Sequence, residues 1–124
     1  PDTAPYGVAA QQALTYLSLW PKIKSNLITG ININQTFQQV RSQAVPLGIV
    51  ANSQLVMNKL SGVIIPTHYY QPITQQLVII KSSRQVALAK KISDYILQTN
   101  SQAKLQSLGY LAVTSSNPLD EAKR

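Results

Sequence analysis

The sequence alternates short apolar runs with longer segments in which apolar residues recur every three or four positions. The periodic segments predict helices over 4–19, 34–42, 86–98 and 101–108. A further short helix is predicted to run to Leu60, with Asn52 or Ser53 as its N-cap. The apolar runs predict strands over 26–29, 46–50, 62–65 and 73–81. Strands that alternate with helices favour an α/β fold with a largely parallel sheet.

Several residues mark the expected ends of these helices. Thr3 is a suitable N-cap for the first helix, and Pro21 is expected to end it. Asn32 or Asn34 is expected to cap the second helix, because a side-chain oxygen can accept from the unpaired N–H groups of a first turn. Gly109 suits the left-handed position that follows the last helix.

The composition indicates one folded domain, or one lobe of a larger protein. Hydrophobic residues make up 44% of the 124 residues, which is enough to bury a core. The aliphatic runs, such as Leu77–Ile80, are too short to cross a bilayer, and we recognise no signal peptide. The chain opens almost directly into a helix without an initiator methionine, which predicts that it is a fragment.

Side chains that carry catalysis are scarce. The chain has no cysteine and one histidine, His68, which excludes disulfides, thiol catalysis and a multi-histidine metal site. No carboxylate lies between Asp2 and Asp94. That stretch provides neither the carboxylate pair of a glycosidase nor acidic ligands for Mg²⁺. We therefore expect no enzyme, no metal site and no cofactor.

The charge balance favours anionic partners. Eleven Lys and Arg residues against four Asp and Glu residues give a formal net charge of +7. The basic side chains of the C-terminal half are either a nucleic-acid interface or a solvated surface: Lys81, Arg84, Lys90, Lys91 and Lys104. The sequence has no nucleic-acid recognition motif, so the solvated surface is favoured and nucleic acid is not expected as a partner.

Three predicted helix starts are candidate sites for a small anion. They are Pro5-Tyr6-Gly7, Asn32-Ile33-Asn34 and the segment Ala51-Asn52-Ser53-Gln54. A helix start presents unpaired N–H groups and about half a positive charge, so it can hold an oxyanion without a cationic side chain. The alternative at each position is an ordinary capped helix start, which is the commoner case.

The segment His68-Tyr69-Tyr70 is the only cluster of aromatic residues. It can stack on a base or a sugar, or pack against a loop or a neighbouring domain. Packing is the favoured interpretation.

Five motifs in the same order resemble the periplasmic molybdate-binding proteins of ABC transporters. They are A-P-Y-G-V-A-A-x-x-A-L at 4–14, N-x-x-Q-T-F-Q-x-V at 32–40, P-L-G-I-V-A-x-S-Q at 46–54, Y-x-P-I-x-Q at 70–75 and L-G-Y at 108–110. The resemblance covers the C-terminal half of such a protein. It implies a truncated lobe of a type II periplasmic binding protein, a three-layer α/β/α fold. Residues 1–80 would belong to the second lobe, 81–113 would return toward the first lobe, and 114–124 would form a polar tail.

The resemblance also implies where the oxyanion would bind. The family uses backbone N–H groups at the positions of Tyr6 and Ile33. Part of the family places a tyrosine hydroxyl where this chain has Ala51, so that contact is absent here. The Tyr6 hydroxyl, Asn52 or Ser53 would have to replace it, and the residues leave that choice open.

The implied function is reversible capture of molybdate or tungstate in the periplasm. The expected partners are the ABC transporter permease and the missing N-terminal lobe of the same protein. A receptor or sensor lobe for sulfate or phosphate, and a basic nucleic-acid-binding domain, are the alternatives. An isolated piece with uncovered apolar surface is also expected to self-associate.

Overall fold

The computed structural model describes residues 4–113, which divide between Gln75 and Gln76 into two compact units. The expected N-cap Thr3 and the expected tail 114–124 lie outside the described residues. No helix in residues 4–113 combines the length and the apolar character needed to cross a membrane.

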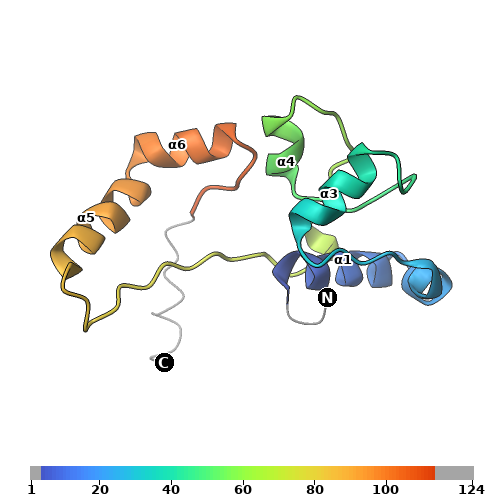
Figure 1. Ribbon diagram of the computed structural model, residues 1–124, viewed down its shortest axis with the longest axis horizontal. Coiled ribbons are helices and arrows are strands. Elements are labelled where there is room, and N and C mark those ends of the chain that lie inside the picture. Colours follow the sequence, from blue (N-terminus) through green and yellow to red (C-terminus); the bar gives the residue numbers. More distant parts are fainter. Residues whose placement is uncertain (1–3, 114–124) are drawn as a thin grey trace. The chain divides into compact units, whose positions relative to one another are not determined.

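The first unit contains the larger set of helices (Figure 1). Its elements are α1 (Pro5–Tyr16), α2 (Trp20–Ile23), the 3₁₀ turn η1 (Lys24–Asn26), α3 (Ile33–Arg41), α4 (Asn52–Met57) and the 3₁₀ turn η2 (Thr67–Tyr69). The second unit contains α5 (Val86–Leu97) and α6 (Thr99–Ser107). Helices α1, α3, α4, α5 and α6 therefore lie where the sequence predicts them, with small differences at their ends, whereas α2 was not predicted.

The core of the first unit is built mainly from small side chains. Ala9 and Ala13 face inward from α1, and Phe37 faces inward from α3. Ala51 is buried at the start of α4. Alanines that are four positions apart share one helix face, which is why the stripe on α1 is buried.

Two expectations about helix ends are wrong. The first helix ends at Tyr16 instead of Leu19, because Ser18 takes a positive φ of 57° and its N–H donates back to Thr15 O at 2.9 Å. Pro21 does not end that helix. It lies in the first turn of α2, where its missing N–H leaves no hydrogen bond unmade.

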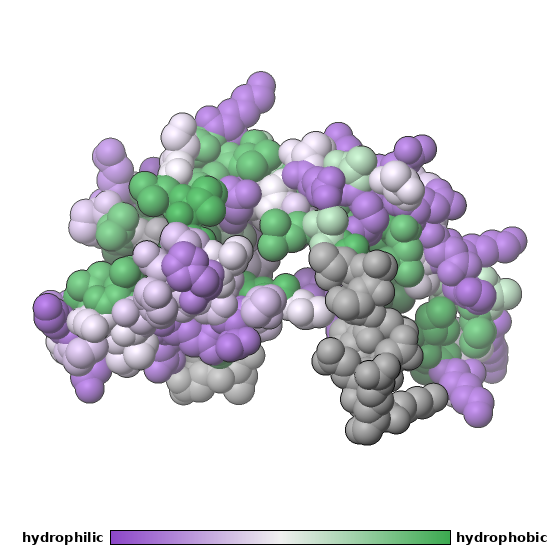
Figure 2. Space-filling view, turned by 180° about the vertical axis from the view of Figure 1, so that it is seen from behind, coloured by the Kyte–Doolittle hydropathy of each residue, from purple (hydrophilic) through white to green (hydrophobic). Residues whose placement is uncertain are grey.

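The predicted strands are not formed by the described residues. The runs 26–29, 46–50, 62–65 and 73–81 contain no strand pairing, and much of their apolar surface is exposed. Val63 is 95% exposed and Val78 is 80% exposed. Figure 2 shows apolar side chains at the surface of both units. An extended segment becomes a strand only when a neighbour pairs with its backbone, so an apolar run is not sufficient by itself.

Candidate functional site

The first candidate residue, Tyr6, lies in the first turn of α1. Pro5 is the first residue of this helix, and its fixed φ suits that position. Tyr6 is half-buried. No acidic side chain occupies the first turn of α1, so no carboxylate of that turn faces the positive end of the helix dipole.

The second candidate residue, Ile33, is the first residue of α3. The sequence predicts Asn32 or Asn34 as the N-cap, and the structure has Asn32. Its Oδ1 atom accepts a hydrogen bond from Gln35 N–H at 2.9 Å. The Gln35 Oε1 atom accepts in return from Ile31 N–H at 2.7 Å. The N–H groups of Ile33 and Asn34 form no hydrogen bond with the part of the chain that the structure describes. The start of α3 therefore offers two adjacent donors to an anion.

The remaining candidates, Asn52 and Ser53, are the first two residues of α4. The predicted cap at Asn52 or Ser53 is wrong, because Ala51 is the N-cap and both polar residues lie inside the helix. The Asn52 side chain is exposed, whereas Ser53 is only 7% exposed. Ala51 is buried and has no hydroxyl to offer a ligand.

Gln54 joins the starts of α3 and α4, a link that local sequence patterns did not predict. Its Oε1 atom accepts from Ala51 N–H at 3.2 Å. Its Nε2 atom donates to Asn34 Oδ1 at 3.0 Å and to Ile33 O at 3.4 Å. The position of Gln54 three residues after the N-cap is the signal for the first of these bonds, because a glutamine there can reach back to the cap. The candidates on α3 and α4 are thus brought together, while Tyr6 lies on another helix of the same unit.

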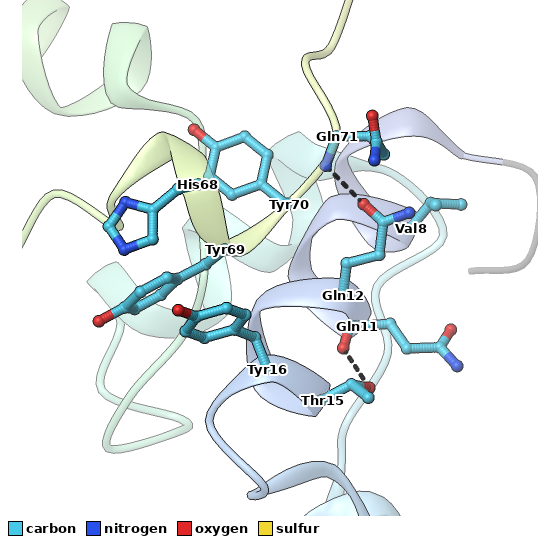
Figure 3. A pocket seen from close by; sticks show the side chains of 9 residues that line it. All are labelled: Val8, Gln11, Gln12, Thr15, Tyr16, His68, Tyr69, Tyr70 and Gln71. Carbon is cyan, nitrogen blue, oxygen red and sulfur yellow. Dashed lines mark hydrogen bonds between the residues drawn. The ribbon is translucent and has the colours of Figure 1, made fainter.

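The aromatic cluster packs η2 against α1. The Tyr16 and Tyr69 rings stack with centroids 4.4 Å apart, and His68 meets Tyr69 edge-on at 4.6 Å (Figure 3). Gln71 N–H donates to Gln12 Oε1 at 2.8 Å. These contacts border an open hollow of about 630 Å³. The rings of His68 and Tyr69 thus pack against Tyr16 on a helix of the same unit, and not against the loop or neighbouring domain that the sequence favours.

The charged side chains of residues 4–113 form one ion pair. Lys90 Nζ and Asp94 Oδ1 form an exposed ion pair at 3.2 Å, one turn apart on α5. Residues 4–113 contain no group of three or more His, Cys, Asp or Glu side chains that could hold a metal ion. The candidate site therefore consists of helix starts and amides.

Comparison with known proteins identifies the family of the chain. Residues 1–111 match the family described as bacterial extracellular solute-binding protein. The molybdate-binding protein ModA of Azotobacter vinelandii is 37% identical over 114 residues, which are 89% of this chain and 45% of that protein. ModA of Rhodobacter capsulatus is 30% identical over 112 residues, covering 90% of this chain and 44% of that protein.

A solved structure is also similar. The chain superposes on the periplasmic molybdate-binding protein of Azotobacter vinelandii with a TM-score of 0.80 and 32% sequence identity. The superposition covers 90% of this chain and 51% of the other. The chain therefore spans about half the length of the relatives that it matches.

Proposed function

Because the chain belongs to the bacterial extracellular solute-binding protein family, we propose that it forms part of the substrate-binding component of an ABC importer for molybdate or tungstate. The match to two molybdate-binding proteins over nine-tenths of the chain is the observation that supports this most strongly. The fold class expected from the sequence, part of a type II periplasmic binding protein, is confirmed by the superposition.

The proposed mechanism is capture by neutral donors. The free N–H groups at the start of α3, and the first turn of α1 around Tyr6, supply hydrogen bonds and the positive ends of two helix dipoles. A dianion accepts from every such donor. In a protonated oxyanion, the O–H group and a protein N–H group would face each other as two donors with no acceptor between them. The site would therefore select the fully ionised form.

We propose that Asn52 or Ser53, at the start of α4, contributes a polar contact to the oxyanion. Their helix, α4, starts beside α3 because Gln54 links the two helices. Selection among dianions would then depend on the size of the cavity, since molybdate and tungstate are larger than sulfate. Lysine and arginine side chains need not touch the ion, and their role would be to attract it over a longer range.

The partners follow from the same proposal. The loaded protein would be extracytoplasmic, in the periplasm, and would deliver its ligand to the permease of the transporter. The relatives are about twice as long as the part that matches this chain. The exposed apolar runs around Val63 and Val78 would pair with the other half of a protein of that length. Transport, and not catalysis, is the activity that this family membership supports.

Titration calorimetry of a hybrid protein tests the proposal. The stretch of the Azotobacter vinelandii protein that matches this chain is replaced by residues 1–111, and molybdate, tungstate, sulfate and phosphate are titrated in turn. We expect tight binding of molybdate and tungstate and no response to sulfate. A hybrid that folds but binds sulfate or phosphate best would support the receptor for another anion. A hybrid that binds none of the four ions would contradict capture of a small oxyanion.

A proline substitution tests the role of the Ile33 N–H. Ile33 is the first residue of α3, and Asn32 before it is extended with φ −156° and ψ 169°, so Ile33→Pro removes one donor and leaves the helix able to form. A hydrogen bond to a charged group contributes about 1.5–3 kcal/mol, so we expect the molybdate affinity of the hybrid to fall about 10- to 150-fold.

Two control variants accompany this measurement. Ile33→Val keeps the N–H and is expected to bind as the parent does. Thr99→Pro places proline at the equivalent first position of α6, outside the site, and is also expected to leave binding unchanged. Equal molybdate affinity of Ile33→Pro and Ile33→Val would show that this N–H does not contact the ion.

A further inference from the structure

One side chain of the first unit makes hydrogen bonds in two opposite directions. Gln54 Oε1 accepts from the N–H of Ala51, the N-cap of its own helix. Gln54 Nε2 donates across to α3, to the side chain of Asn34 and the carbonyl of Ile33. The last two contacts connect α4 to residues 20 and 21 positions earlier in the sequence.

Only a side-chain amide of this length makes this set of bonds. Glutamate could accept from Ala51 N–H, but its carboxylate would repel Asn34 Oδ1 and could not donate to it. Methionine has a similar length and offers neither a strong donor nor a strong acceptor. Asparagine is one methylene shorter, so its amide would not span both partners.

We call the hydrogen bonds of Gln54 with Ala51, Ile33 and Asn34 the Gln54 bridge. It involves the two residues of α3 whose N–H groups are free. Gln54 engages the carbonyl of Ile33 and the side chain of Asn34, which leaves the backbone N–H groups of both residues free for a ligand. A second link joins the far ends of the same two helices, where Arg41 Nη1 donates to Asn58 Oδ1 at 3.4 Å. That link is exposed, as is the bond from Gln54 to Asn34, whereas the bonds from Gln54 to Ala51 and Ile33 are partly buried.

We propose that Gln54 is a positioning residue that holds the start of α3 against the start of α4 and thereby fixes the direction of the oxyanion donors at Ile33 and Asn34. This inference rests on the proposed function. Gln54 would not contact the ion, because its amide is already engaged by Ala51, Asn34 and Ile33. Gln54 would raise the affinity because the N–H groups of Ile33 and Asn34, already held in place, lose less conformational entropy when the ion binds.

Gln54→Met in the hybrid protein is the principal test. At metal sites, loss of an outer partner that orients a ligating side chain lowers affinity about 10- to 100-fold, and by analogy we expect molybdate binding to weaken by about tenfold. Gln38→Met is the matched control, because Gln38 is an exposed glutamine of α3 whose side chain forms none of the hydrogen bonds described. We expect Gln38→Met to bind as the parent does.

Two further measurements separate positioning from folding. In the 124-residue chain, amide hydrogen exchange at Ala51 is expected to accelerate in Gln54→Met and to stay slow in Gln38→Met. In the hybrid, Asn34→Ala removes the side-chain acceptor on α3 and leaves the Ile33 carbonyl in place. The double variant with Gln54→Met is expected to lose no more affinity than Gln54→Met alone, because both changes break the same bridge.

The outcomes are distinguishable from a failure of the proposed function. If the unmodified hybrid does not bind molybdate, the proposed function fails and this inference falls with it. If the hybrid binds molybdate and Gln54→Met binds equally well, the inference alone is overturned. It is also overturned if Asn34→Ala and Gln54→Met lower the affinity additively, since independent effects exclude a shared bridge.

Discussion

Asn32 shows how one side chain defines the start of a helix. Its backbone is extended, and its Oδ1 atom accepts from the N–H of Gln35 at 2.9 Å. The cap thereby satisfies one of the N–H groups that the first turn cannot pair internally and leaves those of Ile33 and Asn34 to a ligand.

Replacement of Asn32 therefore affects stability in a predictable way. We expect Asn32→Ala to lower the free energy of unfolding by about 1 kcal/mol, whereas Asn32→Asp keeps an acceptor oxygen and stays close to the parent. Urea unfolding monitored by circular dichroism measures the free energy of unfolding of the two variants and of the parent chain. Equal midpoints for the alanine and aspartate variants would show that the cap contributes nothing.

At the scale of elements, several helices end without glycine. Ser18, Gln43 and Lys59 follow α1, α3 and α4 with positive φ values of 57°, 59° and 53°. After α6 the same position is held by Gly109, with φ 90°, as the sequence predicts. Glycine is the usual sequence signal for this conformation. Without it, the sequence predicts the ends of α1 and α4 three residues later than the structure has them.

The run 46–50 approaches α3 closely at Gly48. A Cβ atom built on Gly48 would collide with Cγ2 of Val40, a branched side chain fixed to the helix. At Gly62 a Cβ would meet Leu55 Cδ1 at 2.6 Å, the far end of a flexible side chain. The first contact cannot relax by rotation of the side chain alone, while the second can.

Alanine substitutions at these glycines test the close approach. We expect Gly48→Ala to destabilise the chain by about 1–3 kcal/mol, as overpacking does, and Gly62→Ala to cost less. In a Val40→Ala background the cost of Gly48→Ala is expected to fall, because the colliding methyl is gone. Urea unfolding of the four variants measures these effects. An undiminished cost in that background would refute the contact with Val40.

At the scale of the whole molecule, basic side chains outnumber acidic ones. The chain carries a formal net charge of +7, and the Lys90–Asp94 pair is the ion pair formed within residues 4–113. Both of its side chains are exposed, so it adds little to stability. The cations are available to attract anions, but the proposed donors to the ligand are neutral N–H groups.

The salt dependence of binding distinguishes these two roles. If neutral donors hold molybdate, the affinity of the hybrid is expected to fall by less than about tenfold between 50 and 500 mM NaCl, because only long-range attraction is screened. A surface that binds polyanions through many cations would lose about a thousandfold or more. Calorimetry at the two salt concentrations measures this. A steep loss of molybdate affinity would contradict capture by neutral donors.

The sequence alone determined those features that depend on neighbours within about four residues. The apolar period located five helices, the amide of Asn32 predicted one cap, and Gly109 predicted one helix end. It also identified the start of α3 as a source of unpaired N–H groups, because every helix leaves its first N–H groups without an internal partner.

Only the tertiary structure decided the features that join distant residues. The Gln54 bridge connects positions 20 and 21 residues apart, and the burial of Ala51 and Ser53 depends on what packs over them. The runs that predict strands remain unpaired among the described residues, because a strand satisfies its backbone only on another segment. Helix starts are set locally by the sequence, whereas their distance from one another is a property of the folded chain.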